Sequence, residues 1–123
     1  MVSIIVKRTE DYEPFKAVDG SEIVEVIGIP ATGTEGVSLA RAVVKTGGKT
    51  EKHTHDFLEI YMITKGEGIM HINDESKNVC IGDNILIPRG ESHWIENTGK
   101  EDLEIWCICV PAFTAENTNM MKE

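Results

Sequence analysis

The sequence is short of positive charge and of long apolar runs, and each shortage excludes a class of protein. Its 123 residues carry 12 Lys and Arg against 21 Asp and Glu, which gives a net charge of −9. Binding to nucleic acids and to anionic membrane surfaces depends on clustered cations, so we expect no partner of either kind. No apolar run approaches the roughly 18–20 residues that a membrane-spanning helix needs.

Cysteine is also scarce, and a secretory signal is not apparent. The three cysteines are an odd number and do not indicate a disulfide framework. Residues 1–16 lack a cationic start followed by a long apolar stretch. We therefore expect a cytoplasmic protein in a reducing compartment. The length is typical of one domain, so residues 1–123 are predicted to form a single domain with a sufficient core.

Helical periodicity is missing before the last few residues, and short stretches rich in Val and Ile take its place. They are separated by turn signals and cover residues 22–29, 37–45, 57–64, 67–73, 77–81, 84–87, 92–97 and 102–110. Many short strands at near-regular spacing predict an all-β sandwich or barrel. The polar tail, residues 112–123, is expected to form a short helix or a loose strap.

The histidines suggest a metal site. His53 and His55 are two residues apart, so in an extended chain both imidazoles leave the same face. Glu59 follows at an even offset, and His93 begins a separate strand that barrel closure can bring opposite. Three imidazoles and one carboxylate suit zinc, iron, manganese or nickel. A His-x-His pair alone is a weak signal, and His71 is interpreted as a structural strand residue.

The spacing of these residues resembles the cupin superfamily at both of its motifs. The first motif is matched by Gly47, His53, His55, Glu59 and Gly66, with intervals of five, one, three and six residues. The second is matched over residues 82–97 by Gly82, Pro88, Arg89, Gly90, His93 and Asn97. The two motifs are separated by residues 67–81, a spacing typical of small microbial cupins.

This resemblance implies a double-stranded β-helix, which is a jelly-roll barrel open at one end. It also implies that His53, His55, Glu59 and His93 bind one divalent transition metal ion per chain inside that barrel. A cupin barrel that has lost its metal is the alternative. Independently of the resemblance, Gly66 lies where a tight turn favours positive φ, and Asn97 is expected to hold backbone.

The reaction is less well determined, because cupins include dioxygenases, isomerases, decarboxylases, lyases and non-enzymatic sensors. We expect an enzyme acting on a small anionic or sugar-like metabolite, of dioxygenase or isomerase type. A non-catalytic metal-containing binding or sensor module is the alternative. Arg41 shares a face with three aliphatic residues and is predicted to point into the barrel as an anion clamp, unless it forms a salt bridge or lies at the surface. Tyr61 and His71 are weak candidates for a general base.

A homodimer is predicted from exposed apolar surface. Residues 57–62 present apolar side chains on both faces of one strand, whereas a monomeric barrel buries only its inner face. The apolar run Val2–Val6 is a second strand candidate with an unpaired edge. Alternatively, residues before Pro30 and after Pro111 fold back over the same surface. Cys107 and Cys109 share a strand face and are interpreted as small buried apolar residues.

Overall fold

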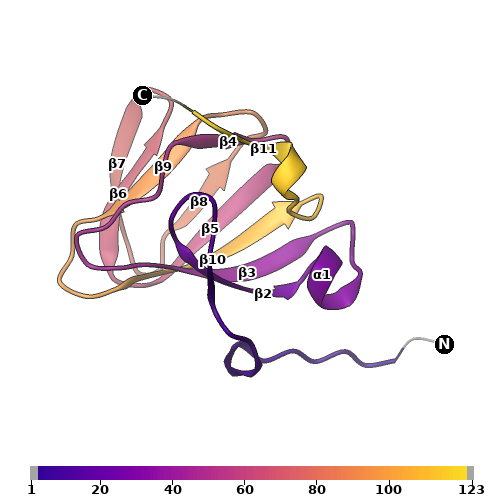
Figure 1. Ribbon diagram of the computed structural model, residues 1–123. Coiled ribbons are helices and arrows are strands. Elements are labelled where there is room, and N and C mark those ends of the chain that lie inside the picture. The colour runs from indigo at the N-terminus through magenta and orange to yellow at the C-terminus, as the bar shows by residue number, and fades with distance from the viewer. Residues whose placement is uncertain (1–2, 122–123) are drawn as a thin grey trace.

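Two antiparallel β-sheets pack face to face in the computed structural model, which describes residues 3–121 (Figure 1). The strands are β1 (Phe15–Lys16), β2 (Glu22–Ile27), β3 (Ser38–Val44), β4 (His53–His55), β5 (Leu58–Lys65), β6 (Glu67–Ile72), β7 (Glu75–Cys80), β8 (Asn84–Ile87), β9 (His93–Asn97), β10 (Leu103–Val110) and β11 (Thr118–Met120). Three helical turns complete the chain: η1 (Thr9–Asp11), α1 (Ile29–Thr32) and η2 (Ala115–Asn117). The predicted all-β jelly roll is confirmed.

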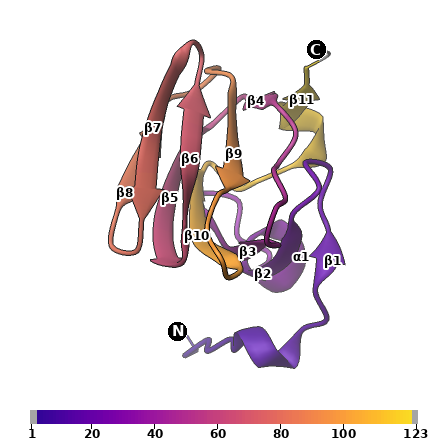
Figure 2. The ribbon, with the colours of Figure 1, turned by 90° about the vertical axis from the view of Figure 1, so that its left-hand side faces the viewer.

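The strand order explains how distant parts of the sequence meet. The first sheet has the order β1-β2-β3-β10-β5-β8, and the second has the order β11-β4-β9-β6-β7. Strand β10 therefore lies between β3 and β5, both of which end more than thirty-five residues before β10 begins (Figures 1 and 2). Because β4 and β5 belong to different sheets, the chain crosses the barrel between them.

Alternating apolar residues fill one end of the barrel. The cluster contains Ala42, Val44, Tyr61, Ile63, Met70, Val79, Ile87, Ile95, Leu103, Ile105 and Cys107. Asn97 closes this end, because its side-chain amide donates to the carbonyls of Val44 (3.0 Å) and Glu101 (2.8 Å). Its predicted role in holding backbone is confirmed. Gly66 has the expected positive φ of 82°, and an added Cβ would lie 2.9 Å from the Asp102 carbonyl oxygen.

The two ends of the chain differ in how they contact the barrel. The N-terminal segment runs outside the barrel below β2, and Ile4 is 92% exposed (Figures 1 and 2). Val2, part of the predicted apolar run, lies outside the described residues. The tail forms η2 and then β11, which pairs with β4. Among residues 3–121, no helix has the length and apolar character that a membrane crossing requires.

Candidate metal centre

Four side chains identified from the sequence meet inside the barrel. His53 and His55 leave one face of β4, and His93 opens β9, where it pairs directly with His53. Glu59 reaches the same place from β5, in the opposite sheet. The two residues after His55 interrupt the strand, so Glu59 approaches the histidines from across the barrel rather than from along one strand.

The four groups lie close together and away from solvent. Nε2 of His53 lies 3.0 Å from Nε2 of His55. Oε1 of Glu59 lies 3.3 Å from Nε2 of both His55 and His93. The four potential ligand atoms all lie within 4.8 Å of one another. His93 is 0% exposed and Glu59 is 5% exposed, so water contributes little to their solvation.

The outer nitrogen of each imidazole is held by a hydrogen bond. Nδ1 of His53 lies 2.7 Å from the Glu51 carbonyl oxygen, and Nδ1 of His93 lies 3.1 Å from that of Glu91. A carbonyl oxygen only accepts, so both Nδ1 atoms carry the proton and donate. Their Nε2 atoms are then left as lone-pair donors that face the cluster.

The carboxylate of Glu59 is oriented in the same way. The Cys109 thiol donates to Oε2 at 3.3 Å, which leaves Oε1 directed at the imidazoles. Burial alone would raise the pKa of Glu59, but the adjacent His55 and His93 rings outweigh it and lower the pKa to about 2. Burial, and then the neighbouring His93 ring, lowers the pKa of His53 to about 4. The cluster therefore combines a carboxylate with a neutral imidazole at neutral pH.

These residues fit a divalent metal ion. Oε1 of Glu59 and Nε2 of His93 are buried and have no hydrogen-bond partner among the described residues. A buried polar atom without a hydrogen-bond partner costs free energy. The protons of His53 and His93 lie on the outward-facing Nδ1 atoms, so they cannot form hydrogen bonds inside the cluster. A cation that accepts electron pairs from all four atoms satisfies the whole cluster. Nitrogen and oxygen donors of this kind suit zinc, iron, manganese or nickel.

A cavity of about 540 Å³ opens beside the cluster. This volume lies within the roughly 300–1,000 Å³ typical of small-molecule sites. Strands β2, β3, β5 and β10 form one wall, and the segment 113–116 forms another. Its lining includes His53, His55 and Glu59, so a molecule in the cavity can contact the candidate metal centre.

The sequence of the barrel strands identifies the protein family. Residues 40–110, more than half of the chain, match the family described as the cupin domain. The chain belongs to the cupin family. The predicted membership is thereby confirmed, and the strand topology described above is the barrel of this family.

Similar proteins agree with this assignment. This cupin is 35% identical to an uncharacterized protein of Methanocaldococcus jannaschii, over 99% of this chain and 100% of the relative. It is 38% identical to the oxalate-binding protein of Thermotoga maritima, over 58% of this chain and 60% of the relative. A crystal structure of a predicted oxalate decarboxylase from Thermotoga maritima has a TM-score of 0.77 and 29% identity, covering 87% of this chain and 99% of that one. The chain thus spans less than two thirds of the oxalate-binding protein.

The buried cluster and these relatives support a metal-binding cupin. The other candidate residues lie outside the two motifs, and their positions relative to the cavity differ. Tyr61 lies on the inner face of β5, lines the cavity, and has its ring centroid 6.0 Å from that of His93. Burial, and then the nearby Glu59, raises the pKa of Tyr61 well above its ordinary value. Tyr61 therefore faces the cavity as a neutral hydroxyl.

The expected inward position of Arg41 is wrong. Arg41 does share a face with Val37, Leu39 and Val43, but that face is the outer one, and its guanidinium lies 4.0 Å from Glu104. The inner face of β3 carries small residues, which leaves room for the cavity. On this outer face Leu39 lines a pocket together with residues of the N-terminal segment.

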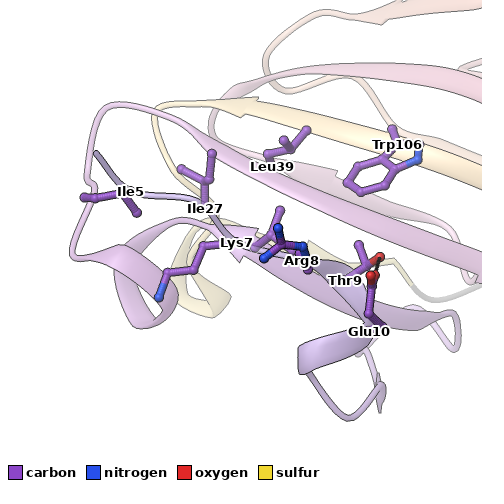
Figure 3. A pocket seen from close by; sticks show the side chains of 9 residues that line it. Ile5, Lys7, Arg8, Thr9, Glu10, Ile27, Leu39 and Trp106 are labelled. Atoms are coloured by element: carbon purple, nitrogen blue, oxygen red, sulfur yellow. Dashed lines mark hydrogen bonds between the residues drawn. The ribbon is translucent and has the colours of Figure 1, made fainter. Parts of the chain in front are cut away.

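His71 and Trp106 also lie outside the barrel. Nε2 of His71 lies 3.0 Å from Glu96, and its ring stacks on Trp94 at 3.7 Å on the outer face of the second sheet. Trp106 faces a separate pocket of about 340 Å³ (Figure 3). In that view the segment carrying Lys7, Arg8, Thr9 and Glu10 runs past β2 and β3. Neither the His71–Trp94 stack nor Trp106 belongs to the candidate metal centre.

Three residues beside the cluster or the cavity were not identified from the sequence. Glu25 lines the cavity from β2, and burial raises the pKa of its carboxyl. Its carboxyl group has no hydrogen bond or ion pair with another side chain among residues 3–121. Cys109 hydrogen bonds to Glu59, and Thr118 lies 2.8 Å from Nδ1 of His55. Only Cys109 carried a sequence signal, because its parity with Cys107 placed both on one strand face.

Proposed function

We propose that this cupin is a metal-dependent enzyme that binds a small organic anion beside a single metal ion. His53, His55, Glu59 and His93 are the proposed ligands of one divalent zinc, iron, manganese or nickel ion. The convergence of their four ligand atoms within 4.8 Å, inside a buried cluster, carries this proposal. Bound there, the metal ion supplies Lewis acidity toward a carbonyl, carboxylate or enolate oxygen.

Charge in the cavity favours a monoanion over oxalate as the ligand. A divalent ion and the single carboxylate ligand sum to one positive charge, which one negative charge on the ligand balances. Among the described lining residues there is no arginine, and Lys16 is the single lysine, opposed by Asp19, Glu25 and Glu116. A second negative charge would therefore be desolvated without a nearby partner. The cavity is also much larger than oxalate requires.

The chain's own residues divide the remaining work. The apolar wall formed by Ala40, Ala42 and Ile105 excludes water and packs against the body of the ligand. The Tyr61 hydroxyl donates a hydrogen bond to it. Glu25 accepts a hydrogen bond or a proton from it, because this carboxyl faces the cavity and its raised pKa suits proton exchange.

Metal analysis followed by turnover assays tests this proposal. Elemental analysis of the purified chain should find about one transition metal ion per chain. Candidate 2-oxo and 2-hydroxy monocarboxylates should bind to the metal-loaded protein more tightly than oxalate does. Oxygen uptake with both oxygen atoms incorporated into the product identifies a dioxygenase, whereas a product of unchanged composition formed without oxygen uptake identifies an isomerase. Tighter binding of oxalate would contradict the charge argument, and absence of a bound metal would contradict the proposal itself.

A binding module without turnover is the second candidate function. The similarity to a protein named for oxalate binding supports it. In that case the Glu25→Gln substitution changes ligand affinity, but neither the wild type nor the variant converts the ligand. In the enzyme, the same substitution lowers turnover with any ligand that still binds. Comparing affinity and turnover in this one variant separates the two functions.

We also propose that the protein forms a homodimer through the outer face of the first sheet. On that face Ile60 of β5 lies between Ile108 of β10 and Leu86 of β8. Leu86 is 58% exposed, and the patch is continuous across three strands. Apolar surface of this kind is commonly covered by two-fold pairing.

Light scattering of the chain and of one charged variant tests the dimer. The wild type should have about twice the monomer mass of 13.6 kDa. Leu86→Asp should reduce the mass to that of the monomer, since the carboxylate cannot be buried without a partner. Val18→Asp, at a similarly exposed position outside the patch, should remain dimeric. A monomeric wild type would contradict the proposed dimer.

The cysteines support a reducing compartment such as the cytoplasm. Cys80 is exposed, Cys107 and Cys109 are buried, and all three are free thiols. An exposed free thiol persists most readily where disulfides are kept reduced. Thiol labelling of the protein isolated from its native cells, without added reductant, should modify Cys80.

A further inference from the structure

The three imidazoles of the metal centre are not held in the same way. The Nδ1 atoms of His53 and His93 each face a carbonyl oxygen, as described above. Nδ1 of His55 instead lies 2.8 Å from the hydroxyl oxygen of Thr118. Thr118 lies more than sixty residues away, on β11 of the C-terminal tail.

This difference matters because a hydroxyl can either donate or accept. A carbonyl fixes the proton on Nδ1, but a hydroxyl that donated to Nδ1 would place the His55 proton on Nε2. Nε2 of His55 would then point its proton at the cluster and could not bind a metal ion. The metal-binding form of His55 therefore requires that Thr118 accept.

The tail supplies a second contact that makes Thr118 an acceptor. The Thr118 hydroxyl lies 3.2 Å from the Thr114 carbonyl oxygen and donates its only proton there. Its oxygen is then free to accept from Nδ1–H of His55. The two strands are in register at this point, because Thr118 pairs with His55 across the β11–β4 ladder.

The same tail also forms part of the cavity wall. Phe113 packs edge-on against the His55 ring, with centroids 5.9 Å apart, and residues 113–116 line the cavity. The Asp56 amide donates to the Asn117 carbonyl at 2.7 Å, immediately beyond the ligand strand. Tail, ligand strand and cavity wall are thus one connected unit.

We propose that Thr118 is a positioning residue of the metal centre. Its hydroxyl holds His55 with the proton on Nδ1 and aims Nε2 at the metal ion, and the C-terminal tail delivers that hydroxyl. The inference rests on the proposed function, since it requires that His55 bind the metal. Hydrogen-bond partners of metal-bound histidines typically change metal affinity about 10–100-fold when they are removed.

Cobalt binding to three variants tests this role. Co²⁺ is titrated into the metal-free full-length chain against a competing chelator, and the visible spectrum of the bound ion is recorded. Thr118→Val keeps the side-chain shape but loses the hydroxyl, so it should bind Co²⁺ about 10–100-fold more weakly and with an altered spectrum. Thr118→Ser keeps the hydroxyl and should restore both the affinity and the spectrum.

A matched control separates the hydrogen bond from a general effect on the strand. Thr54 lies between the two histidines on β4 but opposite Asn119, on the outer side of the ladder. Thr54→Val makes the same chemical change beside the metal centre and should leave cobalt affinity unchanged. If Thr118→Val does not fold, Thr118→Ala takes its place, with Thr118→Ser again as the rescue.

The outcomes distinguish this inference from the proposed function. A wild-type chain that binds no cobalt overturns the proposed metal centre and this inference with it. If the wild type binds cobalt and Thr118→Val binds it with the same affinity and spectrum, only the role of Thr118 is overturned. Equal losses in Thr118→Val and Thr118→Ser would also overturn it, because the serine retains the hydroxyl.

Discussion

The two ends of the barrel are built from the same strands but have opposite chemistry. At one end, β9 contributes Ile95, which is 0% exposed and packs against the other core residues. Two residues earlier the same face of β9 carries His93, which belongs to the metal centre. Strand β5 shows the same division, with Ile63 in the core and Glu59 among the ligands.

This comparison indicates that stability and function are located at different ends. At the apolar end Ile63, Ile95 and Leu103 are at most 2% exposed, and none of them lines the cavity. The polar end has a cavity of about 540 Å³ and keeps buried polar atoms without partners. Substitutions at the two ends should therefore have separable effects on folding and on metal binding.

The largest expected effect is at the polar end. In a chain with both His53→Ala and His55→Ala, two of the four ligands are gone, and metal content should fall from about one ion per chain to nearly none. The far-UV circular dichroism of the strands should persist, since the apolar core is untouched. Full metal retention in this variant would show that the ligands are other residues.

The complementary change is at the apolar end. Ile95→Ala removes buried methyl and methylene groups, and the free energy of unfolding should fall by about 2–5 kcal/mol. The folded fraction should still bind metal stoichiometrically, because Ile95 belongs to the apolar cluster and does not line the cavity. Chemical denaturation measures the loss, with Val110→Ala at a 46% exposed position as a near-neutral control. Loss of metal from folded Ile95→Ala would contradict the separation of the two ends.

Removal of the metal should have an intermediate effect on stability. An ion that binds the folded chain and not the unfolded one contributes about 2.7 kcal/mol when its concentration is 100 times the dissociation constant. Chelation should therefore lower the melting temperature by several degrees without unfolding the barrel at room temperature. Unfolding on chelation, seen as lost strand signal, would mean that the apolar end is not sufficient for folding.

The smallest effect is expected outside the barrel. Arg41 is 30% exposed in its side chain and lies 4.0 Å from Glu104, so the ion pair is long and partly solvated. Arg41→Ala should change the free energy of unfolding by no more than about 1 kcal/mol. Metal content and ligand affinity should be unchanged. A clear loss of ligand binding would return Arg41 to the functional site.

The sequence predicted the metal cluster because its residues are local to two short segments. Spacing alone placed His53 and His55 on one strand face, and the two cupin motifs linked them with Glu59 and His93. Strand positions were also predictable, since Val- and Ile-rich runs alternate with turn signals. Cys107 and Cys109 were correctly expected to be buried, but the hydrogen bond from Cys109 to Glu59 depends on the pairing of β10 with β5.

The errors and omissions have a common physical reason. Alternation along β3 shows which residues share a face, but it does not show which face is inner, and for this reason Arg41 was placed inside the barrel. Glu25 is an isolated acid whose burial arises only when β2 joins the sheet. Thr118 lies in a polar tail whose sequence has only a weak preference for any secondary structure. Its contact with His55 forms only through the long-range pairing of β11 with β4.

X-ray absorption spectroscopy of the metal-loaded protein tests the central claim most directly. The account predicts a first shell of nitrogen and oxygen ligands at about 2.0–2.2 Å, with the outer-shell scattering of three imidazoles. In the chain with both His53→Ala and His55→Ala, which should retain nearly no metal, the metal absorption signal itself should be almost absent. A wild-type spectrum with sulfur ligands, or without imidazole scattering, would contradict a metal centre formed by His53, His55, Glu59 and His93.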